Sequence, residues 1–400
     1  MQNEQLHARL GDRGLFPLLE PMIYLNHAAI SAPSVATRVA VKALLADYER
    51  RGVQAFVTWH TQRARLKEKL AAMIGAKADD LALTGSTTRG VVDTALCFPW
   101  RRGDRVVVFE GEFPGNVTPW QRAAAMFELE VVSLPLTDYT ESDAPGLERL
   151  EAELARGVRL IAVSAVQFQT GLRMPLAAMS ALAHGSGAEI FVDAVQACGA
   201  VPIDVAALGV DYLSCGSHKW LMGLEGAGML YVSPARAPAL RPNIAGWLSH
   251  EDGLTFLFEG PGQLRYDRPI RKRADFLEIG NLSAASFAAL EASLDLILEV
   301  GVAEIHTHVN QYHDGIEPGL IERGFKSLRA QDPARRSGIL GVIPPDGVSV
   351  VALHRALDAR GISCSIPDGV LRFSPHWPNH VDEVEQVLAA IDLCLGDLRA

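Results

Sequence analysis

The feature that most constrains the fold is an alternation of short apolar runs with amphipathic segments over the first two-thirds of the chain. Apolar runs this short are typical of strands buried on both faces of a sheet. Segments such as residues 63–76 and 147–155 lie between them, with apolar residues at helical spacing and charges on the opposite face. The alternation predicts an α/β fold, with a mainly parallel seven-stranded sheet and helices on both faces. The seven strands are expected at residues 80–84, 105–109, 131–134, 160–165, 190–193, 212–215 and 228–232.

The pattern changes near residue 284, where the alternation of strands and helices gives way to a long helical stretch. A passage rich in Gly and Pro follows at residues 337–345. The remaining pattern predicts a smaller α+β C-terminal domain. Its expected elements are the helical stretch from 284 to about 309, a helix near 350–360, strands near 362–366 and 370–374, and a closing helix from 381. We therefore expect an N-terminal arm at residues 1–20, a large domain at 21–283 and a small domain at 284–400.

Net charge and cysteine content indicate which classes of partner the protein binds and in which cellular compartment it works. The formal net charge of −10, from 47 acidic and 37 basic residues, lacks the basic character of a nucleic-acid binder. The five cysteines are scattered singly, without the spacing of a metal site, which indicates a reducing compartment. The polar N-terminus MQNEQLHARL is unlike a signal peptide, and no apolar run has the length of a membrane span. We expect a cytoplasmic protein that binds small molecules, with no metal, nucleic acid or membrane partner.

A lysine motif suggests covalent chemistry. Lys219 lies in Gly216-Ser217-His218-Lys219-Trp220, directly after the strand expected at 212–215 and before the Gly-rich residues 223–228. A lysine on such a sheltered loop can be desolvated, which lowers the pKa of its amine and makes the amine available for a Schiff base. The alternative is a solvated surface lysine.

A carboxylate ends the strand expected at 190–193. Acids at the carboxyl ends of parallel strands point into ligand crevices. Asp193 could there pair with the pyridine nitrogen of pyridoxal-5'-phosphate (PLP), the cofactor that forms Schiff bases with lysine, and Gln196 could reach the ring hydroxyl. An N-cap of a helix is the alternative role for Asp193.

A phosphate cradle is predicted at residues 84–90, where a strand stops at glycine and Ser86, Thr87 and Thr88 open a helix. Free backbone N–H groups, the helix dipole and the hydroxyls attract an anion there. A plain Ser/Thr helix cap is the alternative interpretation.

Two further residues complete a candidate site. Phe113 lies on a turn after the strand expected at 105–109 and could stack on a flat heterocycle, although an isolated Phe is more often part of a core. Arg372 stands alone among apolar residues of the strand near 370–374. It suits capture of a substrate carboxylate, and a structural salt bridge is the competing explanation.

Taken in order, these motifs resemble the class V aminotransferase family of fold-type I PLP-dependent enzymes. That family includes cysteine desulfurases, kynureninases and isopenicillin N epimerase-like proteins. The resemblance extends from Tyr24-Leu25-Asn26-His27-Ala28-Ala29 to the terminal helix. Its most specific part is the pairing of Val192-Asp193-Ala194-Val195-Gln196 with the lysine motif.

The resemblance implies a role for each matching residue. Lys219 would form the internal aldimine, Asp193 would contact the pyridine nitrogen, and Gln196 would lie by the ring oxygen. The phosphate would be held by Thr87, Thr88 and His218. Trp247 and Asn281 look like the tryptophan and asparagine that kynureninases bring to the cofactor region, and the Asn26-His27 segment would lie near the substrate mouth. Such sites are usually built across a homodimer interface, with Asn281 a candidate contact to the second subunit.

Departures from the family pattern leave the reaction open. Phe113 stands where cysteine desulfurases usually present a histidine, and Phe cannot transfer a proton. Gln196 and His218 stand where kynureninases typically carry His and Tyr. Cys364 lies in an expected strand and is interpreted as a packing residue, so a desulfurase lacks its mobile cysteine. We expect an aminotransferase-type enzyme acting on an amino acid. C–S lyase or desulfurase-like elimination, kynureninase-like hydrolysis and epimerisation are the alternatives, and a catalytically silent PLP-binding protein is the non-enzyme alternative.

Overall fold

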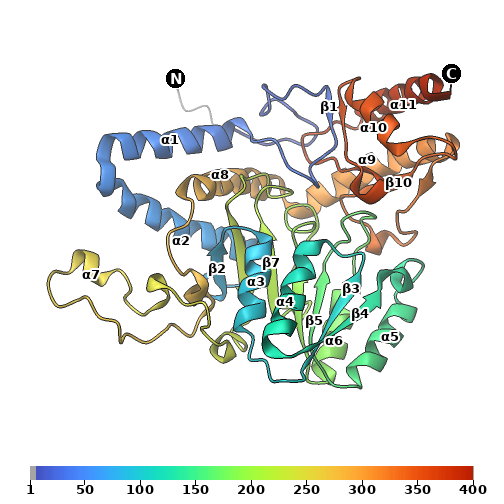
Figure 1. Cartoon of the computed structure of the whole chain (residues 1–400). Helices are drawn as coiled ribbons and strands as arrows, with labels where there is room; N and C mark the ends of the chain where they lie inside the picture. The colour runs from blue at the N-terminus through green and yellow to red at the C-terminus, as the bar shows by residue number, and fades with distance from the viewer. Residues whose placement is uncertain (1–5, 400) are drawn as a thin grey trace.

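A seven-stranded sheet forms the centre of the computed structural model, which describes residues 6–399 (Figure 1). The first five residues of the polar N-terminus lie outside the described part. The strand order is β2-β8-β7-β6-β5-β3-β4, and β8 runs antiparallel to both of its neighbours while the other pairs are parallel. The mainly parallel seven-stranded sheet is thus confirmed, and each strand ends within two residues of its expected limits. The bounds are β2 (Leu81–Thr84), β3 (Arg105–Glu110), β4 (Glu130–Pro135), β5 (Val158–Ser164), β6 (Glu189–Asp193), β7 (Tyr212–Gly216) and β8 (Gly228–Val232).

Helices cover both faces of this sheet. Successive side chains at residues 106–109 of β3 point to opposite faces and are apolar, so both faces must be covered. Val106 and Val108 pack in one apolar cluster with residues of α3 (Thr87–Cys97) and α4 (Thr118–Phe127). Val107 and Phe109 point to the other face and join a cluster with residues of several other helices. These are α2 (Ala55–Met73), α5 (Ala144–Leu154), α6 (Leu176–Gly185) and α8 (Ala284–Val300). Because the strands are buried on both faces, their ends are the places where polar groups can face a ligand.

The N-terminal segment crosses the top of the molecule in Figure 1. It contains β1 (Ile23–Tyr24) and α1 (Val35–Arg51), which packs against α8. Ser34 caps α1, because its hydroxyl accepts the backbone N–H of Thr37 at 3.2 Å. Between β8 and α8 a long excursion carries the short α7 (Thr255–Phe258) and projects from the body at the left of Figure 1.

The C-terminal part has its own apolar cluster, which also includes Ile23 and Leu25 of the N-terminal segment. β1 pairs in parallel with β11, and a three-stranded antiparallel sheet has the order β12-β10-β9. The elements are α9 (Val302–Glu322), β9 (Lys326–Ser327), β10 (Leu340–Ile343), α10 (Val350–Asp358), β11 (Ile362–Ser363), β12 (Leu371–Phe373) and α11 (Glu383–Arg399).

Two details differ from the sequence expectations. The helical stretch from residue 284 is interrupted at Gly301, whose φ of 94° lies outside the helical region, so α8 ends there and α9 begins. The strand expected at 362–366 is reduced to β11 and an isolated bridge between Ser365 and Arg372. The domain limits stay a prediction, and α8 contributes to the apolar cluster of the large sheet.

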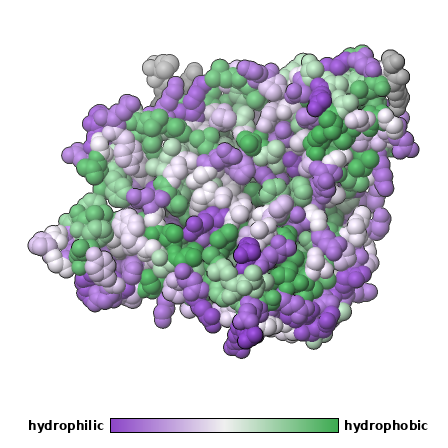
Figure 2. Space-filling view, viewed as in Figure 1, coloured by the Kyte–Doolittle hydropathy of each residue, from purple (hydrophilic) through white to green (hydrophobic). Residues whose placement is uncertain are grey.

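Surface character agrees with this layered core. Figure 2 shows polar and apolar residues interspersed over the viewed face. Among residues 6–399, no helix combines the length and the apolar character that crossing a membrane requires.

Candidate active site

A cavity of about 430 Å³ opens at the carboxyl ends of β6 and β7, beside the first turn of α3. The structure brings most of the expected site residues together here, although they are spread over nearly 290 positions of the chain. The expected side chains that line the cavity are Ser86, Thr87, Thr88, Phe113, Asp193, Gln196, His218, Lys219 and Arg372. The strand-end reasoning therefore located one cavity from five separate motifs.

Lys219 lies on the loop after β7, and its amine is largely withdrawn from water. The pKa of Lys219 is lowered to about 8, chiefly by burial; the carboxylate of Asp193 opposes this shift, and the positive charge of Arg372 adds to it. The Nζ atom lies 5.5 Å from the centre of the Phe113 ring. A substantial fraction of this amine is therefore neutral near pH 7, which a nucleophile or general base needs.

Asp193 ends β6 and is only 4% exposed. Burial raises the pKa of its carboxyl to about 6, against the effects of the Val195 N–H and of Lys219. Its Oδ1 accepts the N–H of Val195 at 3.0 Å, so the capping role considered from the sequence is also present. A buried acid at this position suits a ligand nitrogen that carries a proton.

Gln196 is held from both ends of its amide group. Its Nε2 donates to the carbonyl of Ala28 at 3.0 Å, and its Oε1 accepts the indole N–H of Trp220 at 2.8 Å. The second N–H of the same amide nitrogen is left for the cavity, where the expected partner is a ring oxygen.

The first turn of α3 holds the residues of the phosphate cradle that the sequence predicts. Ser86 caps the helix, and its hydroxyl accepts the N–H of Arg89 at 3.1 Å. The Thr87 hydroxyl accepts the N–H of Gly216 at 2.8 Å, which fixes the start of α3 against the end of β7. Helix geometry leaves the first N–H groups without intrahelical acceptors. These donors, the threonine hydroxyls and the half-buried His218 form a set that fits a phosphate group.

Arg372 also lines the cavity; it lies on β12 and is 4% exposed. Its Nε donates to the Ser365 hydroxyl at 3.0 Å and its Nη1 donates to the Phe168 carbonyl at 2.7 Å. No carboxylate pairs with it within residues 6–399, so the structural salt bridge considered from the sequence is not formed there. Burial lowers the pKa of this guanidinium to about 10. A buried cation without an acid partner is suited to binding a carboxylate from a ligand.

Four expected residues lie outside the cavity. The structure buries His27, whose Nδ1 lies 2.8 Å from the Ser31 hydroxyl, and Asn26 forms a bridge with Ser374. The cavity is lined instead by the next residues of that segment. Trp247 and the exposed Asn281 lie beside a second cavity, lined by their neighbours Leu248, Gly280 and Leu282. Their expected roles stay predictions.

A hydrogen-bonded scaffold behind Lys219 was not expected from the sequence. The Ser31 hydroxyl donates to the carbonyl of Lys219 at 2.6 Å. The buried His376 lies with Nε2 2.9 Å from the carbonyl of Trp220. These contacts hold the lysine loop by its backbone carbonyls, and contacts to backbone carbonyls cannot be predicted from a residue pattern. The one available signal was the position of His376, three residues after β12. Glu112, beside Phe113, is also buried and was not expected to be.

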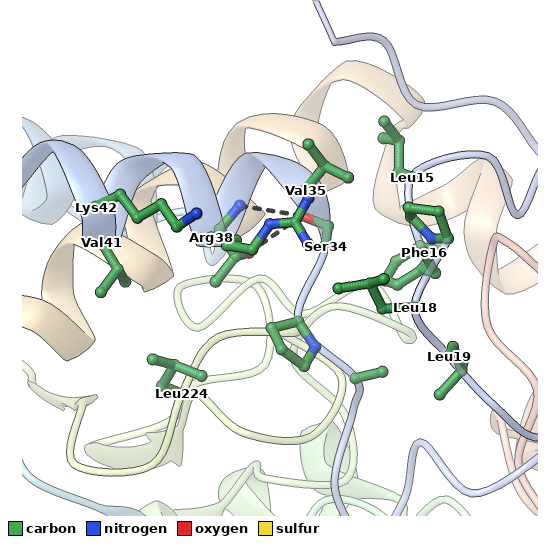
Figure 3. Close-up of a pocket in the computed structure, with 14 residues that line it drawn as sticks. Leu15, Phe16, Leu18, Leu19, Ser34, Val35, Arg38, Val41, Lys42 and Leu224 are labelled. Carbon is green, nitrogen blue, oxygen red and sulfur yellow. Dashed lines mark hydrogen bonds between the residues drawn. The ribbon is translucent and has the colours of Figure 1, made fainter.

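Another cavity, of about 490 Å³, is mostly apolar and lies apart from Lys219 (Figure 3). It lies between residues 15–19 and the first turns of α1, where Arg38 and Lys42 are its charged side chains. Leu224 borders this cavity, whereas Glu225 borders the Lys219 cavity, so the same loop separates the two.

Comparison with known proteins agrees with this arrangement. The family described as Aminotransferase class-V matches residues 23–375. The uncharacterized aminotransferase YcbU of Bacillus subtilis (strain 168) is 27% identical over 396 residues, which cover 95% of this chain and 96% of that protein. A cysteine desulfurase of Dickeya dadantii (strain 3937) is 30% identical over 343 residues, covering 82% of this chain and 79% of that protein. A solved structure of a C-DES mutant with glycine linked covalently to its PLP cofactor has a TM-score of 0.86 at 22% identity, covering 95% of this chain and 98% of that one.

Proposed function

Because the chain belongs to the class-V aminotransferase family, whose members are PLP-dependent enzymes acting on amino acids, we propose that Lys219 carries the cofactor in an aminotransferase-type reaction. The observation that carries the proposal is the placement of a buried lysine, with its pKa lowered to about 8, between Asp193 and Arg372. The donor set fits the cofactor: anion-binding groups at the α3 turn, an acid for the ring nitrogen, and Phe113 for its face.

Each side chain has a task that its surroundings support. PLP, when bound, supplies an electron sink that stabilises the charge left on the substrate Cα. Arg372 orients the substrate carboxylate, and the amine of Lys219 takes the Cα proton as general base once the substrate has displaced it. Asp193 holds the proton of the ring nitrogen, while Thr87 and Thr88 hold the phosphate. The Ser31 and His376 contacts keep the lysine loop in place during this exchange.

Elimination from a sulfur-containing amino acid is the second candidate. Relatives named as cysteine desulfurases favour it. A desulfurase needs an accessible thiolate, but Cys364 is 3% exposed and burial raises the pKa of its thiol to about 12. A C–S lyase needs no such cysteine, so lyase chemistry is the form of this alternative that the site supports. Hydrolysis and epimerisation are weaker alternatives, because no observation favours either.

We also propose a homodimer in the cytoplasm. An exposed apolar segment on the excursion that carries α7 supports the dimer, since Phe258, Leu264 and Tyr266 are 59%, 62% and 87% exposed. Such a patch marks an interaction surface. Trp247 and Asn281, which both lie on this excursion, would then reach the second subunit. All five cysteines are buried free thiols, which supports a reducing compartment.

An absorbance experiment tests the main proposal. Protein supplied with PLP is expected to show a visible band that borohydride removes and that Lys219→Ala abolishes. Absence of the band from the wild-type protein would contradict the proposal. Amino acids are then screened for their effect on the band, and the product is identified as keto acid, sulfide, alanine or epimer. A keto acid formed without sulfide or ammonia supports aminotransferase chemistry, whereas sulfide released together with ammonia and a keto acid supports the lyase. A band that no amino acid changes supports the silent binder.

A further inference from the structure

Glu112 is a buried carboxyl beside the candidate site, and the proposed reaction does not use it. It lies on the turn after β3, where Gly111 adopts a φ of 79°. Its neighbours Gly111, Phe113 and Pro114 are exposed, yet Glu112 itself is only 9% exposed. A carboxylate on a surface turn is ordinarily solvated, because burial of a charge is costly. The turn instead directs this one into the protein.

The contacts of Glu112 place it against the strand that neighbours Asp193. One carboxyl oxygen accepts the backbone N–H of Ser164 at 2.6 Å, and the other accepts the hydroxyl of the same serine. Ser164 ends β5 and is the register partner of Asp193 at the end of β6. Within residues 6–399, Glu112 forms no salt bridge with a Lys, Arg or His. It is therefore a second acid behind the one expected to face the cofactor ring.

We propose that Glu112 supplies a second negative charge behind Asp193, and that this charge acts together with that of Asp193 to set how strongly the cofactor's ring nitrogen and the Lys219-linked end hold their protons. The inference rests on the proposed roles of Lys219 and Asp193. A negative charge on Glu112 opposes a negative charge on Asp193, and the two together favour positive charge on whatever binds between Asp193 and Lys219.

The charged groups around the pair support this reading. Burial and the charge of Asp193 raise the pKa of Glu112 to about 7, although both Ser164 hydrogen bonds act in the opposite direction. Lys219 faces Asp193 from the loop after β7, and the Cys215 thiol lies near both groups. The positive charge of Arg372, on β12, also acts on Lys219. The Ser164 hydroxyl can donate to the ionised form of Glu112 or accept from the neutral one, so this contact is compatible with either charge state.

The test measures the pH midpoint of the visible band of the PLP-bound enzyme. Glu112→Gln keeps an acceptor for the Ser164 N–H and removes the charge. Its midpoint is expected to fall by about 0.5 to 1 pH unit, because positive charge on the bound cofactor loses a stabilising partner. Glu112→Asp keeps the charge and is expected to stay near the wild-type midpoint. Glu110→Gln, at the exposed last residue of β3, is the matched control and should leave the midpoint unchanged.

A Glu112→Gln protein that binds PLP with the same midpoint as the Glu110→Gln control would overturn the inference and leave Glu112 a structural residue. If Glu112→Gln does not fold, Ser164→Ala decides. That variant removes one hydrogen bond to the ionised carboxylate, so Glu112 stays neutral to higher pH. The pH midpoint of the visible band should therefore fall. An unchanged midpoint would again overturn the inference. Failure of the proposed function is seen separately, because the wild-type protein would then lack a borohydride-sensitive band.

Discussion

The reactivity of Lys219 should follow a midpoint near pH 8 rather than that of an ordinary lysine. Its pKa of about 8 replaces the usual 10.5, and the cause is burial reinforced by Arg372. At pH 7.5 about 24% of an amine with a pKa of 8 is neutral, against about 0.1% at a pKa of 10.5. The apoprotein should therefore react with PLP roughly 200-fold faster than an equally accessible but unperturbed lysine at that pH.

Stopped-flow absorbance measures the rate at which Lys219 reacts with PLP. The rate of band formation is recorded after mixing apoprotein with PLP between about pH 6 and pH 9.5, a range that brackets the expected midpoint. Arg372→Gln removes a cation near the amine and should move the midpoint upwards, whereas Asp193→Asn removes an anion and should move it downwards. A rate that still rises steeply at the upper end of this pH range, or variants that move the midpoint in the wrong directions, would refute the account of the lysine's environment.

Further predictions follow from burial and hydrogen bonding. Arg372→Leu should weaken binding of an amino acid by about 10- to 100-fold, the value of a charge-assisted hydrogen bond, and should leave binding of the matching amine without a carboxylate nearly unchanged in spectral titrations. Cys364→Ala should keep product formation at the wild-type level, and a loss of activity would restore the desulfurase reading. His376→Ala should lower the free energy of unfolding in urea by about 1 to 3 kcal/mol, because the buried carbonyl of Trp220 loses its partner. The folded apoprotein is destabilised while the buried amine of Lys219 is charged, because its pKa is lower in the folded protein than in the unfolded chain. Lys219→Met should therefore raise the free energy of unfolding by about 1 to 3 kcal/mol below pH 8. This gain should shrink as the pH rises from 8 towards 10.5.

The sheet could be predicted because its strands are buried on both faces and are therefore continuous apolar runs. The direction of β8 could not, because an antiparallel strand in this position has the same residue pattern as a parallel one. The break at Gly301 was also missed, since the apolar spacing continues across it into α9 and only the backbone conformation of the glycine separates the helices.

The site residues also fall into two groups, those that the sequence predicts and those that it does not. Residues that face the ligand, such as Asp193 and Lys219, follow strands and could be predicted from their positions. Ser31 and His376 could not, because they act on backbone carbonyls that belong to no motif. Burial of Glu112 depends on the turn at Gly111, which carries an acid inward between exposed neighbours.

Charge explains why this cavity suits the cofactor and substrate together. It holds two cations withdrawn from water, Lys219 and Arg372, against one buried acid, Asp193, since Glu225 at its border is exposed, and burial lowers the pKa of both cations. Unbalanced buried charge costs stability, so the cavity gains most from a ligand that carries negative groups. The α3 turn and Arg372 both offer donors suited to anions, and Phe113 and the Ala28 segment add uncharged surface to the same cavity. A ligand with a phosphate at one end, a carboxylate at the other and a flat ring between them satisfies all of these groups at once, and a PLP-bound amino acid has this form.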